Sequence, residues 1–331
     1  NDLTTGSYNT GLGALALDKV TTADSNTGIG YNALAANTTG ASNTAVGTAA
    51  LDANTTASNN TAVGTSALGA NTTGDRGAAL GKSAVAANTT GTENVGIGYQ
   101  ALDANTTGAA NTAVGSEALG ANTTANYNTA VGTAALILNT TGTRNTALGA
   151  LALDAATTAD GNTGLGYGAL SATTTGSANI AVGEYAAVSN TTGDSNTVVG
   201  RAAFYTNTTG ARNVAIGSSS MNANTTASDS VSIGYESMLS NTTGANNTAV
   251  GKATLRANTT AANITAIGYS TLYANTTGSA NTAVGSNALA ANTTGTNNTA
   301  LGTAALTANT TGVHNTGLGF KALAVNTTGA Q

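Results

Sequence analysis

The amino-acid sequence predicts an all-β fold, a parallel β-solenoid (β-roll) made of one short coil that is repeated along the whole chain. Three observations predict it: a repeat of constant length, glycines at fixed places in that repeat, and β-branched residues at others. Repeats of this kind are typical of solenoids, in which each repeat buries its apolar side only against its neighbours.

The repeat begins at Asn9, in the string NTGLG, and equivalent strings begin at Asn26, at Asn43 and at the same interval of seventeen as far as Asn315. Nineteen full coils therefore fill residues 9–331 as a single repetitive domain without insertion or deletion. Residues 1–8 form a partial coil that matches the second half of a preceding coil. Solenoids need caps, and none is recognisable, so we expect the repeat to continue on at least one side or to stack end to end.

Composition argues against several other classes. The chain contains 43 Gly, no Pro and no Cys, and only 7% of its residues are charged. Collagen needs Gly at every third residue, and disordered chains are typically charged and Pro-rich. The net charge of −5 offers no basic footprint for nucleic acid, and no apolar run is long enough for a membrane span.

We number the coil positions 1–17 from the first asparagine, and the consensus is N-T-A-V-G-x-x-A-L-x-A-N-T-T-G-x-x. Position 4 is always aliphatic, position 5 always Gly, position 9 always apolar, and positions 13 and 14 always Thr. Glycines and β-branched residues disfavour a helix and suit short strands joined by tight corners. Positions 6, 7, 10, 16 and 17 vary freely and carry most of the charges.

Alternation along the strand T-A-V places positions 2 and 4 on one face, and we expect both to lie inside together with position 9. Position 2 is usually Thr but is sometimes Val or Ile, as a half-buried site would be. We expect corners at the glycines of positions 5 and 15. The predicted structural core includes Val46, Leu51, Val63, Leu68, Val114, Leu119, Val284 and Leu289. The predicted corner glycines include Gly47, Gly64, Gly115 and Gly285.

The run N-T-T at positions 12–14 predicts side-chain ladders, because stacked coils bring identical residues together about every 4.8 Å. Nineteen coils would make a rod of roughly 90 Å. The predicted ladder residues include Asn54, Thr55, Thr56, Asn71, Thr72 and Thr73. N-T-T is also a glycosylation sequon, in 16 coils, but that spacing leaves no room for a sugar on every coil, and sparse glycosylation remains an alternative.

Small residues recur at position 3, apart from Val198, and at position 8. If positions 4 and 9 face inward, these neighbours face outward, where close packing of another chain would require small side chains. A flattened coil, whose own corners demand small side chains, is the alternative. The chain-packing candidates are Ala45, Ala50, Ala62, Ala67, Ala113 and Ala118.

A second period, of four coils, relates Tyr31, Tyr99, Tyr167 and Tyr235, and the same spacing relates Arg76, Arg144 and Arg212. Tandem duplication of a four-coil block explains this most simply. A four-coil assembly repeat is the alternative.

The coils NTAVGTAALDANTTASN at 43–59 and NTAVGSNALAANTTGTN at 281–297 resemble repeats of bacterial surface fibres and phage-type tail fibres. They are also similar to the shorter N-S-V-A-I-G coils in the heads of trimeric autotransporter adhesins. This resemblance covers the whole chain. It implies a left-handed parallel β-roll that is trimeric, extracellular and adhesive or spacer-like.

Catalytic and cofactor chemistry has little support in the sequence. The one histidine, His314, stands at a variable position, and carboxylates such as Asp18, Asp52 and Glu117 are scattered. Strings such as Gly28-Ile29-Gly30 recur with the coil rather than opening a helix, so they are corner glycines and not a nucleotide-binding motif. We expect no cofactor, no metal and no enzyme. A glycan-processing carboxylate pair of the tailspike kind is an alternative, since stacked coils can bring two carboxylates about 5–9 Å apart.

We therefore expect an extracellular structural fibre or adhesin shaft, on a cell surface or a virion. Its principal partner would be a second copy of itself, in a homo-oligomer such as a trimer or in a self-assembled filament. Exposed variable positions, Tyr31 and its four-coil equivalents among them, are where a surface glycan or a host receptor would bind. Regular Thr ladders also suggest an alternative, an ice-binding solenoid.

Overall fold

The computed structural model describes residues 5–329 and contains 19 short parallel strands, which form one sheet in which sequence neighbours pair. Residues 5–329 contain no helix. The strands are β1 (Thr10–Leu12), β2 (Thr27–Ile29), β3 (Thr44–Val46), β4 (Thr61–Val63), β5 (Ala78–Leu80), β6 (Val95–Ile97), β7 (Thr112–Val114), β8 (Thr129–Val131), β9 (Thr146–Leu148), β10 (Thr163–Leu165), β11 (Ile180–Val182), β12 (Thr197–Val199), β13 (Val214–Ile216), β14 (Val231–Ile233), β15 (Thr248–Val250), β16 (Thr265–Ile267), β17 (Thr282–Val284), β18 (Thr299–Leu301) and β19 (Thr316–Leu318).

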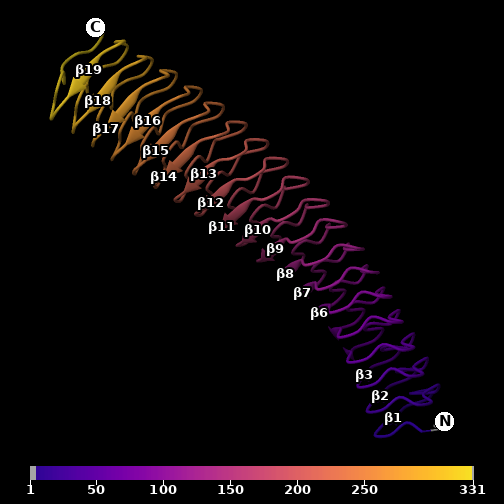
Figure 1. Cartoon of the computed structure of the whole chain (residues 1–331). Helices are drawn as coiled ribbons and strands as arrows, with labels where there is room; N and C mark the ends of the chain where they lie inside the picture. The colour runs from indigo at the N-terminus through magenta and orange to yellow at the C-terminus, as the bar shows by residue number, and fades with distance from the viewer. Residues whose placement is uncertain (1–4, 330–331) are drawn as a thin grey trace. The chain divides into compact units, whose positions relative to one another are not determined.

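Consecutive strands lie side by side, as from β1 to β3 (Figure 1). Equivalent positions pair across the sheet, as between β3 and β4, where Thr44 lies opposite Thr61 and Val46 opposite Val63. Each strand therefore pairs with the strand one coil further along the chain, at the interval that the sequence repeat has. This confirms the predicted parallel β-solenoid.

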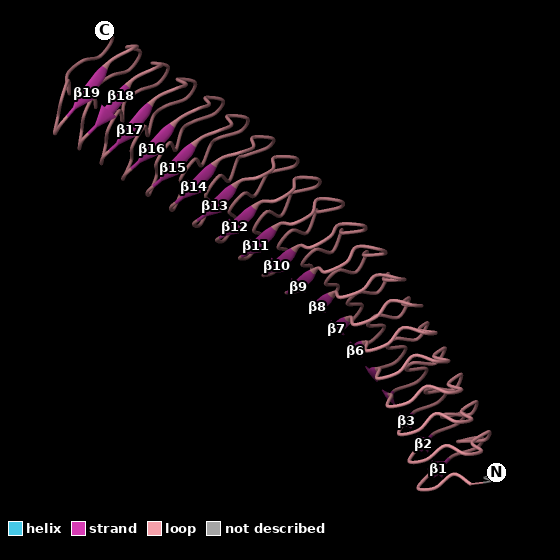
Figure 2. Cartoon of the chain, viewed as in Figure 1, coloured by secondary structure: helices cyan, strands magenta, loops and turns pink. Residues whose placement is uncertain are grey.

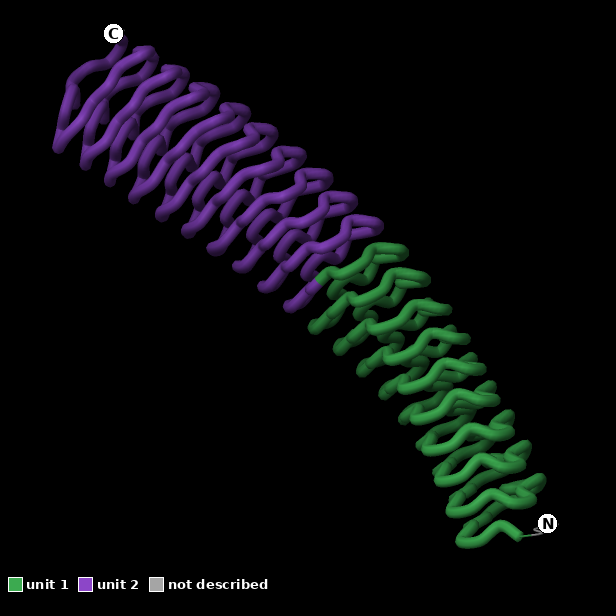
Figure 3. Tube along the Cα trace, viewed as in Figure 1, with its two compact units in different colours: residues 1–162 green, residues 163–331 purple. Residues whose placement is uncertain are grey.

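The chain divides into two compact units, residues 1–162 with β1–β9 and residues 163–331 with β10–β19 (Figure 3). Each unit is built from the same coil. Residues 1–4 of the predicted partial coil, and residues 330–331 of the last coil, lie outside the described residues. The described part of the partial coil continues the stack, because the backbone nitrogen of Thr5 donates to the carbonyl of Thr21, 3.2 Å away.

Each strand has only three residues, and the remainder of the coil is turns and irregular backbone (Figure 2). Hydrogen bonding between coils nevertheless continues outside the strands. The backbone nitrogen of Leu51 donates to the carbonyl of Ala67 (3.0 Å), and that of Thr55 to Thr72 (3.1 Å). The stacking of equivalent backbone groups, more than the short sheet alone, therefore holds neighbouring coils in register.

The first corner follows the strand at position 5, where Gly47, Gly64, Gly115 and Gly285 have φ between 131° and 140°. A side chain is excluded there, since a Cβ on Gly47 would lie 2.6 Å from the carbonyl oxygen of Gly64. These four predicted corner glycines are confirmed. The expected second corner at position 15 is wrong: this position is buried without a positive φ, and the left-handed residue of that bend is position 17, as at Asn59 (φ 63°).

The side chain that points into the coil from each strand is that of the middle residue, at position 3. The side chains at positions 2 and 4 point outward. Predicted core residues at position 9 are confirmed, since Leu51, Leu68, Leu119 and Leu289 are at most 1% exposed. The predicted core residues at position 4 are wrong. Val46, Val63, Val114 and Val284 are partly exposed on the outer side of the sheet.

The reason is the narrow interior of the coil. A Cβ added to Gly28, at position 3, would lie 3.1 Å from Cγ of Leu17, which is the position-9 residue of the preceding coil. The leucine side chains at position 9 fill the space beneath the strand, so position 3 is small where they are present. The one larger residue at position 3, the buried Val198, stands where position 9 of the preceding coil is Ala187. The chain-packing assignment of these small residues is therefore wrong, and the flattened-coil alternative holds: Ala45, Ala50, Ala62, Ala67, Ala113 and Ala118 are 0% exposed within their own coils.

Candidate functional site: the outer sheet face and the decorated turn

The outer sheet face, defined as the side chains at positions 2 and 4, is an uncharged and partly exposed surface in both units. Position 4 is Val, Ile or Leu in every coil, and position 2 is Thr in 14 of 19. At position 4, Leu80 is 51% exposed and Leu301 is 47% exposed, and Leu12 and Leu318 in the first and last full coils are more exposed still. Strand pairing stacks equivalent residues, so the aliphatic side chains of position 4 form a row beside the Thr-rich row of position 2.

The predicted ladder asparagines Asn54 and Asn71 are buried and hydrogen-bonded. Nδ2 of Asn54 donates to Oδ1 of Asn37 (2.8 Å) and to the carbonyl of Ala57 (3.0 Å), and Asn71 repeats the pattern on Asn54 (3.1 Å). Both predicted ladder asparagines are confirmed. Their nitrogens are 0% exposed with the rest of each residue, so the folded coil does not present them to a sugar-transferring enzyme.

A second asparagine ladder, at position 1, was missed from the sequence. The backbone nitrogen of Asn43 donates to Oδ1 of Asn26 (2.9 Å), and Nδ2 of Asn43 donates to the carbonyl of Ala57 (2.8 Å). The two ladders thus share the position-15 carbonyl as an acceptor, which explains why position 15 is buried. The available signal was the near-constant Asn at position 1, interrupted only at Gly77, Ser230 and Ile264.

The paired threonines have different roles. Position 13 is half-buried, and its hydroxyl donates to the next coil, as from Thr55 to the carbonyl of Thr72 (3.1 Å) and from Thr72 to that of Thr89 (3.0 Å). The predicted ladder is confirmed for these two. Thr56 and Thr73, at position 14, are exposed, and their side chains belong to the surface instead.

The tyrosine strip is a set of exposed and half-buried side chains on the turn that follows the Gly corner, at positions 6, 7 and 10 of the seven coils β10–β16. It holds six of the ten tyrosines of the chain. The strip consists of Tyr167, Tyr185, Tyr205, Tyr235, Tyr269 and Tyr273, with the charged residues Glu184, Arg201, Glu236, Lys252 and Arg256.

The side chains of the strip contact one another across coils. Tyr167 and Tyr185 meet edge to face with ring centroids 5.3 Å apart, and Tyr185 and Tyr205 do so at 6.4 Å. Nε of Arg256 donates to Oε2 of Glu236 (2.8 Å), and the guanidinium carbon lies 5.8 Å from the centroid of the Tyr273 ring. Hydrogen bonding from Arg256, followed by that from Tyr235, lowers the pKa of Glu236.

The tyrosines of the four-coil period occupy position 6 with similar exposure, 53% for Tyr31 and 48% for Tyr99. The period does not by itself bring rings together, because four coils separate successive members. The ring–ring contacts of the strip depend on Tyr185 and Tyr205, which lie outside that period. The arginine period lies at position 17, where Arg76 pairs with Glu93 of the next coil (2.7 Å) and Arg212 pairs with Asp229 (2.7 Å).

The scattered carboxylates do not converge on a metal site. Residues 5–329 contain no group of three or more His, Cys, Asp or Glu side chains able to hold a metal ion. A shallow hollow of about 260 Å³ in the first unit contains Asp103 and Glu117, and partial burial raises the pKa of Asp103. His314 stands at position 17, in the left-handed residue of the bend (φ 59°).

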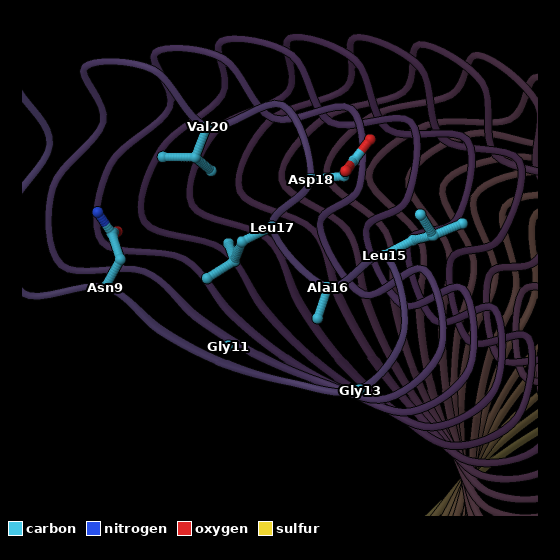
Figure 4. Close-up of a pocket in the computed structure, with 8 residues that line it drawn as sticks. All are labelled: Asn9, Gly11, Gly13, Leu15, Ala16, Leu17, Asp18 and Val20. Carbon is cyan, nitrogen blue, oxygen red and sulfur yellow. The ribbon is translucent and has the colours of Figure 1, made fainter. Parts of the chain in front are cut away.

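A second hollow, of about 310 Å³, is the open side of the first full coil (Figure 4). Its lining includes inner residues of that coil, such as Leu17 and Val20, and one carboxylate, Asp18. Among residues 5–329, Asp18 is the one titratable side chain in this lining, so the described residues place no acid–base pair there.

No protein-family model and no curated protein matches this chain. Within residues 5–329, no helix is long and apolar enough to cross a membrane.

Proposed function

We propose that the chain is a structural element of an extracellular fibre, assembled by lateral packing of copies through the outer sheet face. The observation that carries the proposal is the uncharged aliphatic rank at position 4, which is outward-facing in every coil. A surface residue with no contact to make has no reason to remain aliphatic while positions 6, 7 and 10 vary freely.

The size of the face is sufficient for self-association. Side chains at positions 2 and 4 cover a width of roughly 10 Å, and each coil adds about 4.8 Å, so 19 coils present on the order of 900 Å². Stable complexes bury about 800 Å² on each partner. The partner on this face is a second copy of the same chain. Two copies of the same uncharged row of side chains can pack together without bringing like charges into contact. A trimer is the arrangement that the resemblance to adhesin heads implies.

The test is the mass of the full chain in solution. Wild-type protein should form a defined oligomer by sedimentation equilibrium, and the double variant Ile97→Lys, Leu148→Lys should be monomeric, because each copy would bury two unpaired charges. The matched control, Thr107→Lys with Thr158→Lys, places the same charges at exposed position 14 of the same two coils and should remain oligomeric. A monomeric wild type, or equal dissociation of the control, would contradict the proposal.

An ice-binding surface is a second candidate, favoured by the outward Thr rank at position 2. Thr44, Thr61 and their equivalents lie beside methyl groups of position 4 on the same regular face. A face that orders water must be free, so this function requires a monomer, whereas the fibre requires an assembly. Thermal hysteresis of a monomeric wild type would support it, and an absence of hysteresis and ice shaping at high protein concentration would exclude it.

A further inference from the structure

We propose that the tyrosine strip is a binding site for a neutral polysaccharide. The proposal does not depend on lateral packing, since the strip lies beyond the Gly corner and shares no residue with the outer sheet face. Tyrosines are distributed unevenly over the exposed turns of the chain. Positions 6, 7 and 10 of the nine coils β1–β9 carry only two tyrosines, Tyr31 and Tyr99, four coils apart, whereas the seven coils β10–β16 carry six.

The strip presents aromatic surface that the fold does not need. Tyr167, Tyr235 and Tyr269 are 46%, 50% and 54% exposed, and the interior of each coil is already filled by position 9. Small residues occupy the same turn in several other coils, for example Thr303 and Ala304. Exposed tyrosines combine an apolar ring with a hydroxyl, which suits a ligand that has both C–H and O–H groups on its surface.

One pair of polar groups between the rings is partly buried and held in place. Glu236 and Arg256 form the least exposed of the four ion pairs found within residues 5–329, with side chains 24% and 34% exposed. Glu184 also pairs with Arg201, at 3.3 Å, but these side chains are 51% and 71% exposed, so this second pair is held less firmly. Carboxylate and guanidinium groups fixed in this way offer acceptors and donors to hydroxyl groups without a further cost of ordering the side chains.

The charge balance favours a neutral ligand. The strip contains two carboxylates and three cations, four of which pair with one another, and Lys252 lies 5.9 Å from the centroid of the Tyr235 ring. A polyanion would need a run of unpaired cations. A ligand of repeating sugar units also fits the shape of the site, since the tyrosines extend over seven successive coils instead of enclosing one pocket.

The test is native affinity electrophoresis of the full chain, which is acidic and migrates to the anode, in gels containing dextran, xyloglucan or glucomannan. At least one of these neutral polysaccharides should retard the wild type. The variant Tyr185→Ala, Tyr205→Ala, Tyr273→Ala should bind at least about tenfold more weakly, because three rings are removed. The corresponding Phe variant should retain most of the binding, since it keeps the ring surface.

The matched control removes three tyrosines of the first unit, Tyr31→Ala, Tyr99→Ala and Tyr127→Ala, which are 48–66% exposed. It should be retarded as strongly as the wild type, and circular dichroism should show that both variants are folded. Three outcomes would overturn the proposal: no retardation in any neutral gel, equal loss in the control, or retardation only in gels containing the anionic polysaccharides alginate or heparin. The last outcome would assign the chain to polyanions.

Discussion

Nδ2 of Asn105 donates a hydrogen bond to Oδ1 of Asn88, which lies 2.8 Å away in the preceding coil. The same nitrogen donates to the carbonyl of Gly108 (3.0 Å), and Oδ1 of Asn105 accepts from Asn122 (2.9 Å). Each amide is therefore both donor and acceptor in a buried chain, where hydrogen bonds reinforce one another. The ladder specifies the register of the stack, because a shift by one residue would leave every amide without its partner.

The ladder is interrupted where Ala156 occupies position 12, and this interruption gives the first prediction. Oδ1 of Asn139, one coil earlier, is buried and has no hydrogen-bond partner within the described part of the chain. The substitution Ala156→Asn supplies the missing donor and should raise the free energy of unfolding by about 1–2 kcal/mol. Urea unfolding followed by circular dichroism would measure it.

The control for this substitution is Ala155→Asn, at the neighbouring position 11, which is only partly buried. It changes the composition equally without reaching the ladder, and we expect a change within about 0.5 kcal/mol. If both variants shift the unfolding midpoint alike, the stabilisation does not come from the Asn139 acceptor.

Adjacent threonines give the second prediction. The hydroxyl of Thr106, at position 13, donates to the carbonyl of Thr123 (3.1 Å), whereas Thr107, at position 14, is exposed. Thr106→Val should therefore lower the free energy of unfolding by about 1 kcal/mol, and Thr107→Val should leave it almost unchanged. Urea titrations of the two variants would compare isosteric changes one residue apart. Equal destabilisation would show that the inter-coil hydrogen bond contributes nothing specific.

The sequence predicts the coil length, the parallel stacking and the leucine core, because the repeat itself compares each position in nineteen copies. It does not say which face of the strand is inside. Alternation shows that Val46 shares a face with Thr44, but whether that face is the inner one depends on what lies opposite. Here Leu51 and its equivalents lie opposite, and they exclude a branched side chain. Small residues at position 3 in every coil but that of Val198 were the signal of this crowding.

The turn between positions 6 and 11 was beyond sequence reasoning for a different reason. Ala49 and Leu51 have φ of 55° and 51°, in the left-handed region that favours glycine or asparagine. Alanine and leucine do not indicate a left-handed conformation in a sequence. The conformation is imposed here by the hydrogen bonds between stacked coils and by burial of the leucine side chain. The contacts of the tyrosine strip depend on this turn, which directs positions 6, 7 and 10 outward, so the strip could be predicted only as a set of variable positions.

Corner glycines give the third prediction. Gly47→Ala requires a side chain at φ 140° and places Cβ 2.6 Å from the carbonyl oxygen of Gly64, so we expect a loss of at least about 3 kcal/mol or failure to fold. Gly69→Ala is the matched control. Its Cβ would lie 3.3 Å from the nearest atom, the carbonyl oxygen of Ser66, and Ala already stands at the same position in Ala86.

Thermal unfolding of the two alanine variants would check this prediction, and Gly69→Ala should differ from the wild type by no more than about 1 kcal/mol, because the substitution also restricts the unfolded chain. A Gly47→Ala protein as stable as the wild type would mean that the corner can adopt a different backbone conformation.

The carboxyl groups of Glu236 and Asp103 give the fourth prediction, because their surroundings shift their pKa values in opposite directions. Hydrogen bonds from Arg256 and then Tyr235 lower the pKa of Glu236, whereas burial raises that of Asp103. For Glu236, the folded-state pKa lies below the unfolded value of about 4.3, so its contribution to stability is present above that pH and is lost as the pH falls through the folded-state pKa. For Asp103 the sign is reversed, and its unfavourable contribution disappears on acidification.

Carbon-13 NMR of the side-chain carboxyl carbons would follow both groups in one titration. In the variant Arg256→Gln, the pKa of Glu236 should rise towards its ordinary range, because the main hydrogen bond to the carboxylate is lost. Asp103 lies in the other unit and should keep its raised pKa, which makes it the internal control. If Glu236 titrates at the same pH in wild type and variant, the ion pair does not order this part of the strip, and the polar groups between the tyrosines are not fixed in advance of ligand binding.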